Sequence, residues 1–164
     1  MEVIRAPSVE YRDEKPYVGI RVRTPMVGMS DAVEALKKEL DAELRGNGVI
    51  ATGPCFLRLH VIDMKGIMDI EVGRPVDEAR ALGDRIRPGA LPAGQYANYV
   101  FAGPGIAGNG FLLRWIKEQG LQMDRWEDPN GDAFRCRCET FLTDPKLEHR
   151  RKKWEIEMAV KLIG

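Results

Sequence analysis

The residues best suited to acid–base chemistry are a glutamate and a histidine, Glu139 and His60, one in each half of the chain. The two halves read as one pattern written twice. When residues 54–62 (PCFLRLHVI) are placed over residues 133–141 (AFRCRCETF), His60 and Glu139 fall at equivalent positions. If the two side chains meet where the halves join, they can share a proton and activate water. A Glu139 that lines an apolar groove would have a raised pKa and attract a cation or act as a general base.

Each of these residues also has a purely structural interpretation. Strand alternation places Glu139 beside Arg137, so the two can form an exposed salt bridge that contributes little stability. His60 shares its face with Arg58 and Ile62, a mixed environment that is also typical of a surface or core histidine. The spacing alone leaves both interpretations open.

The repeated unit that would position these residues is strand, strand, helix, strand, strand. In the first half, residues 17–23 alternate as a half-buried strand, and residues 30–45 carry the apolar stripe of a helix capped by Ser30. Two further strands are predicted at 55–62 and 67–73.

The second half repeats this order. Residues 85–91 and 95–102 predict a hairpin through Pro92-Ala93-Gly94, followed by a helix at about 109–119, a loop over 121–133, and strands at 134–142 and 153–162. The sequence therefore predicts one α+β domain over 1–164, with a first repeat at about 1–80 and a second at about 84–164.

Aromatic side chains are the candidates for lining a ligand groove. Tyr96 lies on one face of the strand at 95–102, and two other aromatic residues share the opposite face. Such rings can stack on flat or cationic ligands, although core packing produces the same spacing. The candidates are Tyr96, Tyr99, Phe101, Phe111, Trp115 and Phe141.

Composition excludes several classes of function. Lys+Arg and Asp+Glu number 25 each, so there is no charge footprint for nucleic acid as the main partner. The three cysteines predict buried reduced thiols rather than a disulfide framework. With only two histidines, no metal site is expected, and no cofactor. No apolar run approaches the roughly 20 residues that cross a membrane, which predicts a cytoplasmic protein without membrane segments.

Two short motifs match functional patterns, but each has a simpler structural interpretation. Residues 103–108 (GPGIAG) match the dinucleotide-binding pattern G-x-G-x-x-G, but the preceding strand is polar and alternating. A tight turn or an open groove mouth is the better interpretation. The basic run at 149–153 (HRRKK) lies on a connection between strands and is expected to be a solvated loop.

Four segments of the second half carry a resemblance to a known family: 91–104 (LPAGQYANYVFAGP), 111–121 (FLLRWIKEQGL), 138–145 (CETFLTDP) and 154–162 (WEIEMAVKL). They resemble gyrase-inhibitor-like (GyrI-like) domains, which also serve as effector-binding domains of multidrug-responsive transcription regulators. The resemblance implies duplicated β-β-α-β-β (SHS2-type) units that form a curved antiparallel sheet with two helices and a central groove.

The resemblance also implies a function. A stand-alone GyrI-like domain would bind amphipathic, aromatic or cationic small molecules, with Glu139 as the polar anchor of the groove. The family includes members that resemble hydrolases of electrophilic xenobiotics. The alternative is therefore hydrolysis, with Glu139, Trp115 and His60 as the catalytic residues. A third interpretation is a protein-binding module such as a topoisomerase inhibitor. Binding is favoured over turnover, and the identity of any protein partner is left open.

Overall fold

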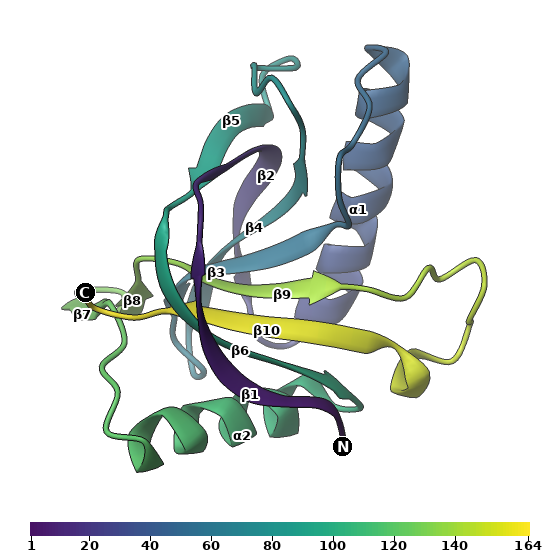
Figure 1. Cartoon of the computed structure of the whole chain (residues 1–164). Helices are drawn as coiled ribbons and strands as arrows, with labels where there is room; N and C mark the ends of the chain where they lie inside the picture. The colour runs from purple at the N-terminus through teal and green to yellow at the C-terminus, as the bar shows by residue number, and fades with distance from the viewer.

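The computed structural model describes residues 1–164 as a ten-stranded antiparallel sheet with two α-helices (Figure 1). The elements in chain order are β1 (Glu2–Arg12), β2 (Lys15–Pro25), α1 (Met29–Gly46), β3 (Phe56–Ile62), β4 (Ile67–Pro75), β5 (Ile86–Leu91), β6 (Gly94–Ala102), α2 (Gly105–Glu118), β7 (Arg125–Asp128), β8 (Gly131–Phe134), β9 (Arg137–Phe141), the 3-10 helix η1 (Arg151–Lys153) and β10 (Glu155–Lys161). The order strand, strand, helix, strand, strand occurs twice, with the β7–β8 hairpin added in the second half. The expected α+β fold with a curved antiparallel sheet and two helices is confirmed.

The strand order shows how the two halves join. The sheet runs β1-β6-β10-β9-β3-β4-β2-β5, and β8 connects the β7–β8 hairpin to β3. The halves meet at the β3–β9 pair, where Leu57 lies opposite Glu139 and Arg58 lies opposite Cys138. The outer strands are exchanged: β1 pairs with β6 of the second half, and β5 pairs with β2 of the first half. The sheet is curved but not closed into a barrel, since β1 and β5 are its two ends.

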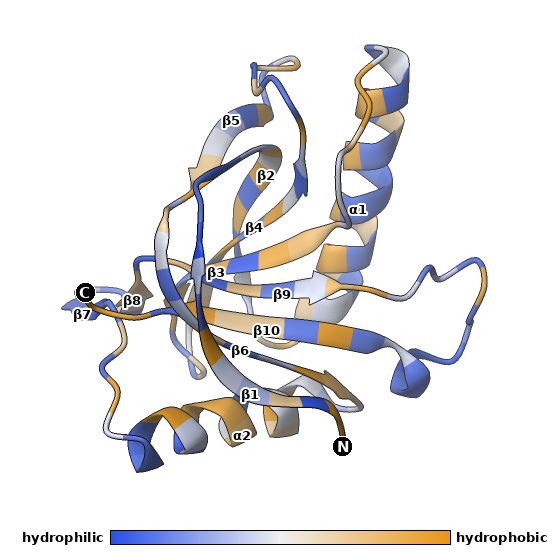
Figure 2. Cartoon of the chain, viewed as in Figure 1, coloured by the Kyte–Doolittle hydropathy of each residue, from blue (hydrophilic) through white to orange (hydrophobic).

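One face of the sheet, called here the helix face, is covered by α1 and α2. Both helices are amphipathic, so hydrophobic and hydrophilic residues alternate along them (Figure 2). Leu36, Leu40 and Leu44 of α1 pack on the first half of the sheet, and Leu112 and Ile116 of α2 pack on the second. Each helix therefore buries its apolar stripe against the strands of its own half.

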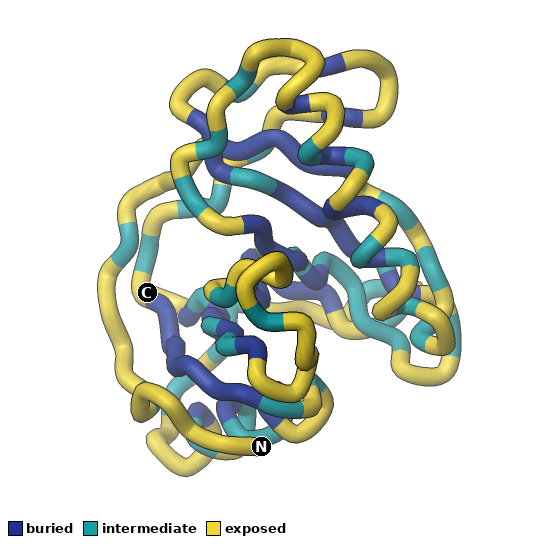
Figure 3. The backbone as a smooth tube through the Cα atoms, turned by 90° about the vertical axis from the view of Figure 1, so that its right-hand side faces the viewer, coloured by how far each residue is buried: buried dark blue, intermediate teal, exposed yellow.

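The opposite face of the sheet, called here the pocket face, carries a smaller apolar cluster. Figure 3 shows that the buried residues are concentrated in the strands, whereas β1 is exposed along most of its length. The cluster on the pocket face joins both halves, and its buried members are Tyr17, Phe56, Tyr96, Cys136, Cys138 and Ala159.

Two predictions about the connections are wrong. Residues 121–133 are not a loop throughout, because β7 and β8 form a hairpin whose turn uses the Pro, Asn and Gly residues that suggested the loop. Residues 85–91 and 95–102 do not pair as a hairpin. The segment Pro92-Ala93-Gly94 instead carries the chain across the sheet, from β5, which pairs with β2 of the first half, to β6, which pairs with β10 of the second half.

The helix starts also differ from the prediction. α1 begins at Met29 after Gly28, whose φ is 81°, and no side chain caps it, so Ser30 lies inside the helix rather than at its cap. α2 begins at Gly105, four residues before the predicted start at Asn109. Neither helix combines the length and the apolar character needed to cross a membrane.

Candidate functional site

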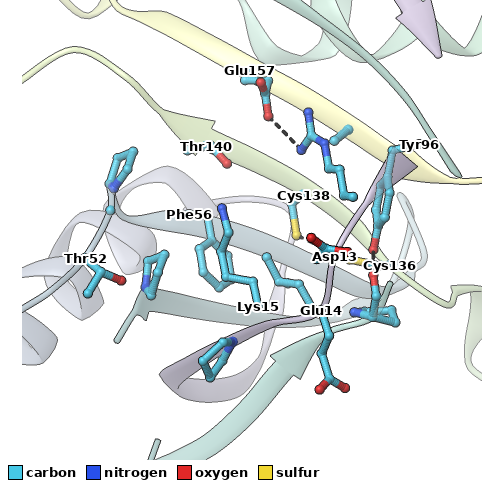
Figure 4. Close-up of a pocket in the computed structure, with 18 of the residues that line it drawn as sticks. Asp13, Glu14, Lys15, Thr52, Phe56, Tyr96, Cys136, Cys138, Thr140 and Glu157 are labelled. Carbon is cyan, nitrogen blue, oxygen red and sulfur yellow. Dashed lines mark hydrogen bonds and ion pairs between the residues drawn. The ribbon is translucent and has the colours of Figure 1, made fainter. Parts of the chain in front are cut away.

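A pocket of about 690 Å³ opens on the pocket face, between the two halves. Its walls come from the β1–β2 turn, the segments that lead into β3 and out of β4, the β5–β6 connection, and β9 and β10. Figure 4 shows side chains from these elements pointing into one space. A cavity of this size fits a drug-sized ligand. The lining residues used below are Arg12, Phe56, Tyr96, Cys136, Cys138 and Glu157.

Glu157 of β10, labelled in Figure 4, contributes a carboxylate to the part of the pocket wall that the second half forms. This carboxylate accepts hydrogen bonds from Arg12 Nη1 and Arg5 Nη2, both at 3.0 Å. The Arg12 guanidinium also lies 5.5 Å from the centre of the Tyr96 ring. Tyr96 is held in place because its hydroxyl donates to the Pro92 carbonyl at 2.6 Å. A carboxylate and an aromatic ring thus hold a positive charge that belongs to the protein itself.

The first half carries a different polar network on the same face. Glu71 Oε1 accepts a hydrogen bond from the Tyr17 hydroxyl at 2.7 Å and lies 2.8 Å from His60 Nε2, while Arg58 Nη1 donates to the Tyr17 hydroxyl at 2.9 Å. Burial opposes the charged form of Glu71, but the bonds from His60 and Tyr17 hold its pKa below the usual value. His60 is therefore engaged by Glu71, whose side chain is only 8% exposed.

Two cysteines of the second half also line the pocket. Cys136 and Cys138 are both buried, and their sulfurs are 3.8 Å apart (Figure 4). The hydrogen bond with Cys138 is the main cause that lowers the pKa of Cys136 to about 7, with burial opposing it and the charge of Arg58 assisting. Cys55 lies apart from them in the core under α1, where burial raises its pKa to about 11.

Glu139 lies on the helix face, not in this pocket. Asn109 of α2 donates from Nδ2 to Glu139 Oε1 at 3.4 Å, and Arg137 Nη2 donates to Asn109 Oδ1 at 2.7 Å. Burial raises the pKa of Glu139 against the opposing charges of Arg137 and Lys37. The same burial lowers the pKa of Arg137 to about 10. This is a buried polar group between sheet and helix.

The predicted aromatic residues divide between the two faces. Tyr96 lines the pocket, while Tyr99 of β6 stacks on Phe101 of the same strand and on Phe111 of α2, with ring centres 5.4 and 5.2 Å apart. Trp115 is partly buried against the same core. Phe141 also lies on the helix face, where the Lys37 ammonium sits 3.4 Å from its ring centre.

The register that made His60 and Glu139 equivalent does not hold. Glu139 lies opposite Leu57, which packs under α1, whereas His60 contacts Glu71 on the pocket face. Leu57 and Cys136, which the same register made equivalent, also lie on opposite faces, so the alignment of the two halves is wrong by an odd number of residues and moves every side chain to the other face. The two residues therefore cannot act on one water molecule.

Glu157 was missed as a site residue, although the sequence contained a signal for it. The register that places residues 68–73 over 154–159 makes Glu71 and Glu157 equivalent. In the structure both carboxylates lie on the pocket face, one in each half. An acid repeated at the same position of the duplicated pattern was thus the better guide to the pocket.

The glycine-rich segment and the basic run have structural roles. The segment 103–108 leads from β6 into α2 within an antiparallel sheet, so the parallel unit of a dinucleotide site is missing. In the basic run, the Arg150 guanidinium pairs with Glu148 at 2.7 Å on the surface, and residues 151–153 form the 3-10 helix η1 rather than the predicted loop.

Replacing Glu139 by glutamine is expected to stabilise the protein at pH 7, and the gain should disappear toward pH 4. Because the native pKa of Glu139 is raised, its stabilising contribution is complete below the ordinary glutamate pKa of about 4.3 and is lost as pH rises through the native value. Urea unfolding of both proteins from pH 4 to pH 8 measures the difference. A variant that becomes relatively less stable with rising pH would show that Arg137 outweighs burial.

Comparison with known proteins identifies the fold. No family model and no curated protein matches the chain. Among solved structures, the C-terminal domain of EcmrR matches with a TM-score of 0.75 and 15% identity, covering 98% of each chain. In the structure of EcmrR bound to DNA, the match covers 97% of this chain but only 57% of the EcmrR chain, with a TM-score of 0.76 and 14% identity.

Two other similar structures concern small molecules or hydrolysis. SAV2435, solved bound to tetraphenylphosphonium, matches with a TM-score of 0.64 and 13% identity over 97% of this chain and 94% of its own. A hydrolase from Listeria innocua matches with a TM-score of 0.63 and 14% identity over 97% and 92%. At these identities the likeness shows the fold, and it agrees with the fold implied by the resemblance to GyrI-like domains.

Proposed function

We propose that this chain is a binding domain for amphipathic aromatic or cationic small molecules, which it takes up in the pocket between its two halves. The observation that carries the proposal is the Arg12 guanidinium, which is paired with Glu157 and lies over the Tyr96 ring. A site that already holds a cation between a carboxylate and an aromatic ring has the chemistry to hold a ligand cation. The bound tetraphenylphosphonium of SAV2435, an aromatic cation, supports the same ligand class.

Glu157 is proposed as the anchor because its carboxylate faces the pocket and its side chain is 19% exposed. Glu139, the anchor predicted from the sequence, stays a competing proposal. For Glu139 to act, a ligand would have to enter between α2 and the sheet, where Asn109 now contacts the carboxylate. The two proposals differ in which substitution weakens binding.

Calorimetric titration with tetraphenylphosphonium tests both anchors. Replacing Glu157 by glutamine is expected to weaken binding about tenfold or more, since one charge-assisted contact contributes at least about 1.5 kcal/mol and Arg12 and Arg5 would then repel the cation. Replacing Glu139 by glutamine serves as the matched control and is expected to leave the affinity unchanged. The reverse pattern would assign the anchor to Glu139, and no binding by the unaltered protein would contradict the proposed function.

Hydrolysis of an electrophilic ligand is the second candidate, supported by the likeness to the Listeria innocua hydrolase. His60 and Glu139 lie on opposite faces, so any general base would act without the other. Mass spectrometry of electrophilic aromatic compounds incubated with the protein detects addition of water. Turnover that depends on Glu157 or Glu139 would favour an enzyme, and compounds recovered unchanged favour a binding domain.

A further inference from the structure

The two thiols in the pocket form a pair with a defined geometry. Cys138 lies in β9 and Cys136 directly precedes the strand, and both side chains pack in the same cluster on the pocket face. Their sulfurs are 3.8 Å apart and both cysteines are free. No group of three His, Cys, Asp or Glu residues is arranged around a metal position. Any atom that bridges the two sulfurs would therefore take its remaining bonds from outside the protein.

The sulfur separation restricts the geometry of a bridging atom. Two bonds of about 2.3 Å, the thiolate–metal length typical of zinc, meet at about 110° when they start from sulfurs 3.8 Å apart. This angle suits a pyramidal or tetrahedral centre. A linear two-coordinate ion would need the sulfurs to move apart.

The surroundings of the thiols favour a neutral aromatic group over a hydrated cation. Phe56, Tyr96 and Ala159 pack around the two cysteines in one cluster. Arg58 lies directly opposite Cys138 in the β3–β9 ladder. A guanidinium group beside the sulfurs disfavours a divalent metal ion at that point, whereas the rings give an apolar substituent something to pack against.

We infer that Cys136 and Cys138 form a dithiol site for organic compounds of trivalent arsenic with an aromatic substituent. Arsenic(III) is thiophilic and pyramidal, and it forms bonds to two sulfurs while keeping its carbon substituent. An aryl arsenic oxide loses its oxygen as water, which takes one proton from each thiol, and two As–S bonds form. Arsenic remains trivalent, so no oxidant or reductant is needed. The site shares the pocket of the proposed function but does not use Glu157.

Phenylarsine oxide and intact-protein mass spectrometry test the inference on the reduced protein. The expected product carries one phenylarsenic group and has lost two hydrogens. The Cys55→Ser variant should form the same adduct, because Cys55 lies in the separate core under α1. The Cys136→Ser and Cys138→Ser variants should lose it. A competing dithiol such as 2,3-dimercaptopropanol should remove the arsenic, while the same concentration of a monothiol should not.

Several results would overturn the inference. One is an adduct that persists when either Cys136 or Cys138 is replaced by serine. Another is an adduct that disappears when Cys55 is replaced. A third is arsenic that is taken up only after the protein is unfolded in urea. If a serine variant fails to fold, peptide mapping of the unaltered protein decides, since the arsenic must lie on the peptide that contains both residues. Failure of tetraphenylphosphonium binding with arsenic capture intact would count against the proposed function alone. Capture retained in Glu157→Gln would confirm that the two sites are independent.

Discussion

Replacing Phe101 by alanine is expected to lower the free energy of unfolding by about 3–5 kcal/mol, the range found for deleting a buried aromatic ring. Phe101 is fully buried between β6 and α2 and stacks on Tyr99 with a ring-centre distance of 5.4 Å. The ring lies in the core under α2, away from the pocket. Equilibrium urea unfolding measures the loss, and binding of tetraphenylphosphonium to the remaining folded protein should be unchanged.

Gly108 provides an independent check on this packing. A Cβ atom at Gly108 of α2 would clash with the Phe101 ring, which lies against the helix backbone at that point. Gly108→Ala is expected to destabilise by about 1–3 kcal/mol, and Phe101→Leu in the same chain should recover part of that loss. If Phe101→Ala keeps its stability but loses ligand binding, the ring belongs to a site rather than to the core.

Replacing Arg12 by methionine is expected to strengthen tetraphenylphosphonium binding ten- to a hundredfold. The Arg12 guanidinium occupies the position between Glu157 and Tyr96 that the ligand cation is proposed to take, so a ligand must first displace it. A hydrogen bond to a charged group contributes about 1.5–3 kcal/mol, and each 1.4 kcal/mol changes an affinity about tenfold. Methionine keeps the length of the side chain without its charge.

Arg21→Met is the matched control for this experiment. Arg21 also forms an ion pair from a strand, with Asp69 at 2.8 Å, but does not line the pocket. Its replacement should leave the affinity unchanged. Weaker binding by the Arg12 variant would mean that the guanidinium contacts the ligand favourably, and the pocket would then suit anionic rather than cationic molecules.

The sequence predicted the parts of the fold that depend on local pattern. The alternation of β2 and the apolar stripe of α1 led to the correct elements, because each buries one face against the other. β1 was not predicted. It is an edge strand, exposed along most of its length and with an irregular register around Pro7, so it lacks the alternation of a half-buried strand. Its pairing with β6 is a long-range contact that no local pattern encodes.

The site was harder to predict because it depends on which face each side chain takes. Alternation correctly grouped Arg137, Glu139 and Phe141 on one face of the strand. It did not indicate which of the two faces meets the helices. That choice is set by Leu57, which lies opposite Glu139 and packs under α1. The pocket on the other side depends on Arg12 from β1, the strand that the sequence did not reveal.

The exchange of the outer strands means that neither half of the chain is a self-sufficient folding unit. A fragment that ends after β4 would carry β1 without its partner β6, and its own β2 would lack β5. This fragment and the fragment that contains the second half can complete each other only by exchanging their outer strands, as the two halves do within one chain. We therefore expect the two pieces to stay associated when the link between β4 and β5 is cut. A molecule bound between the two halves would contact both of them. Its residence time would therefore depend on how often the whole domain opens.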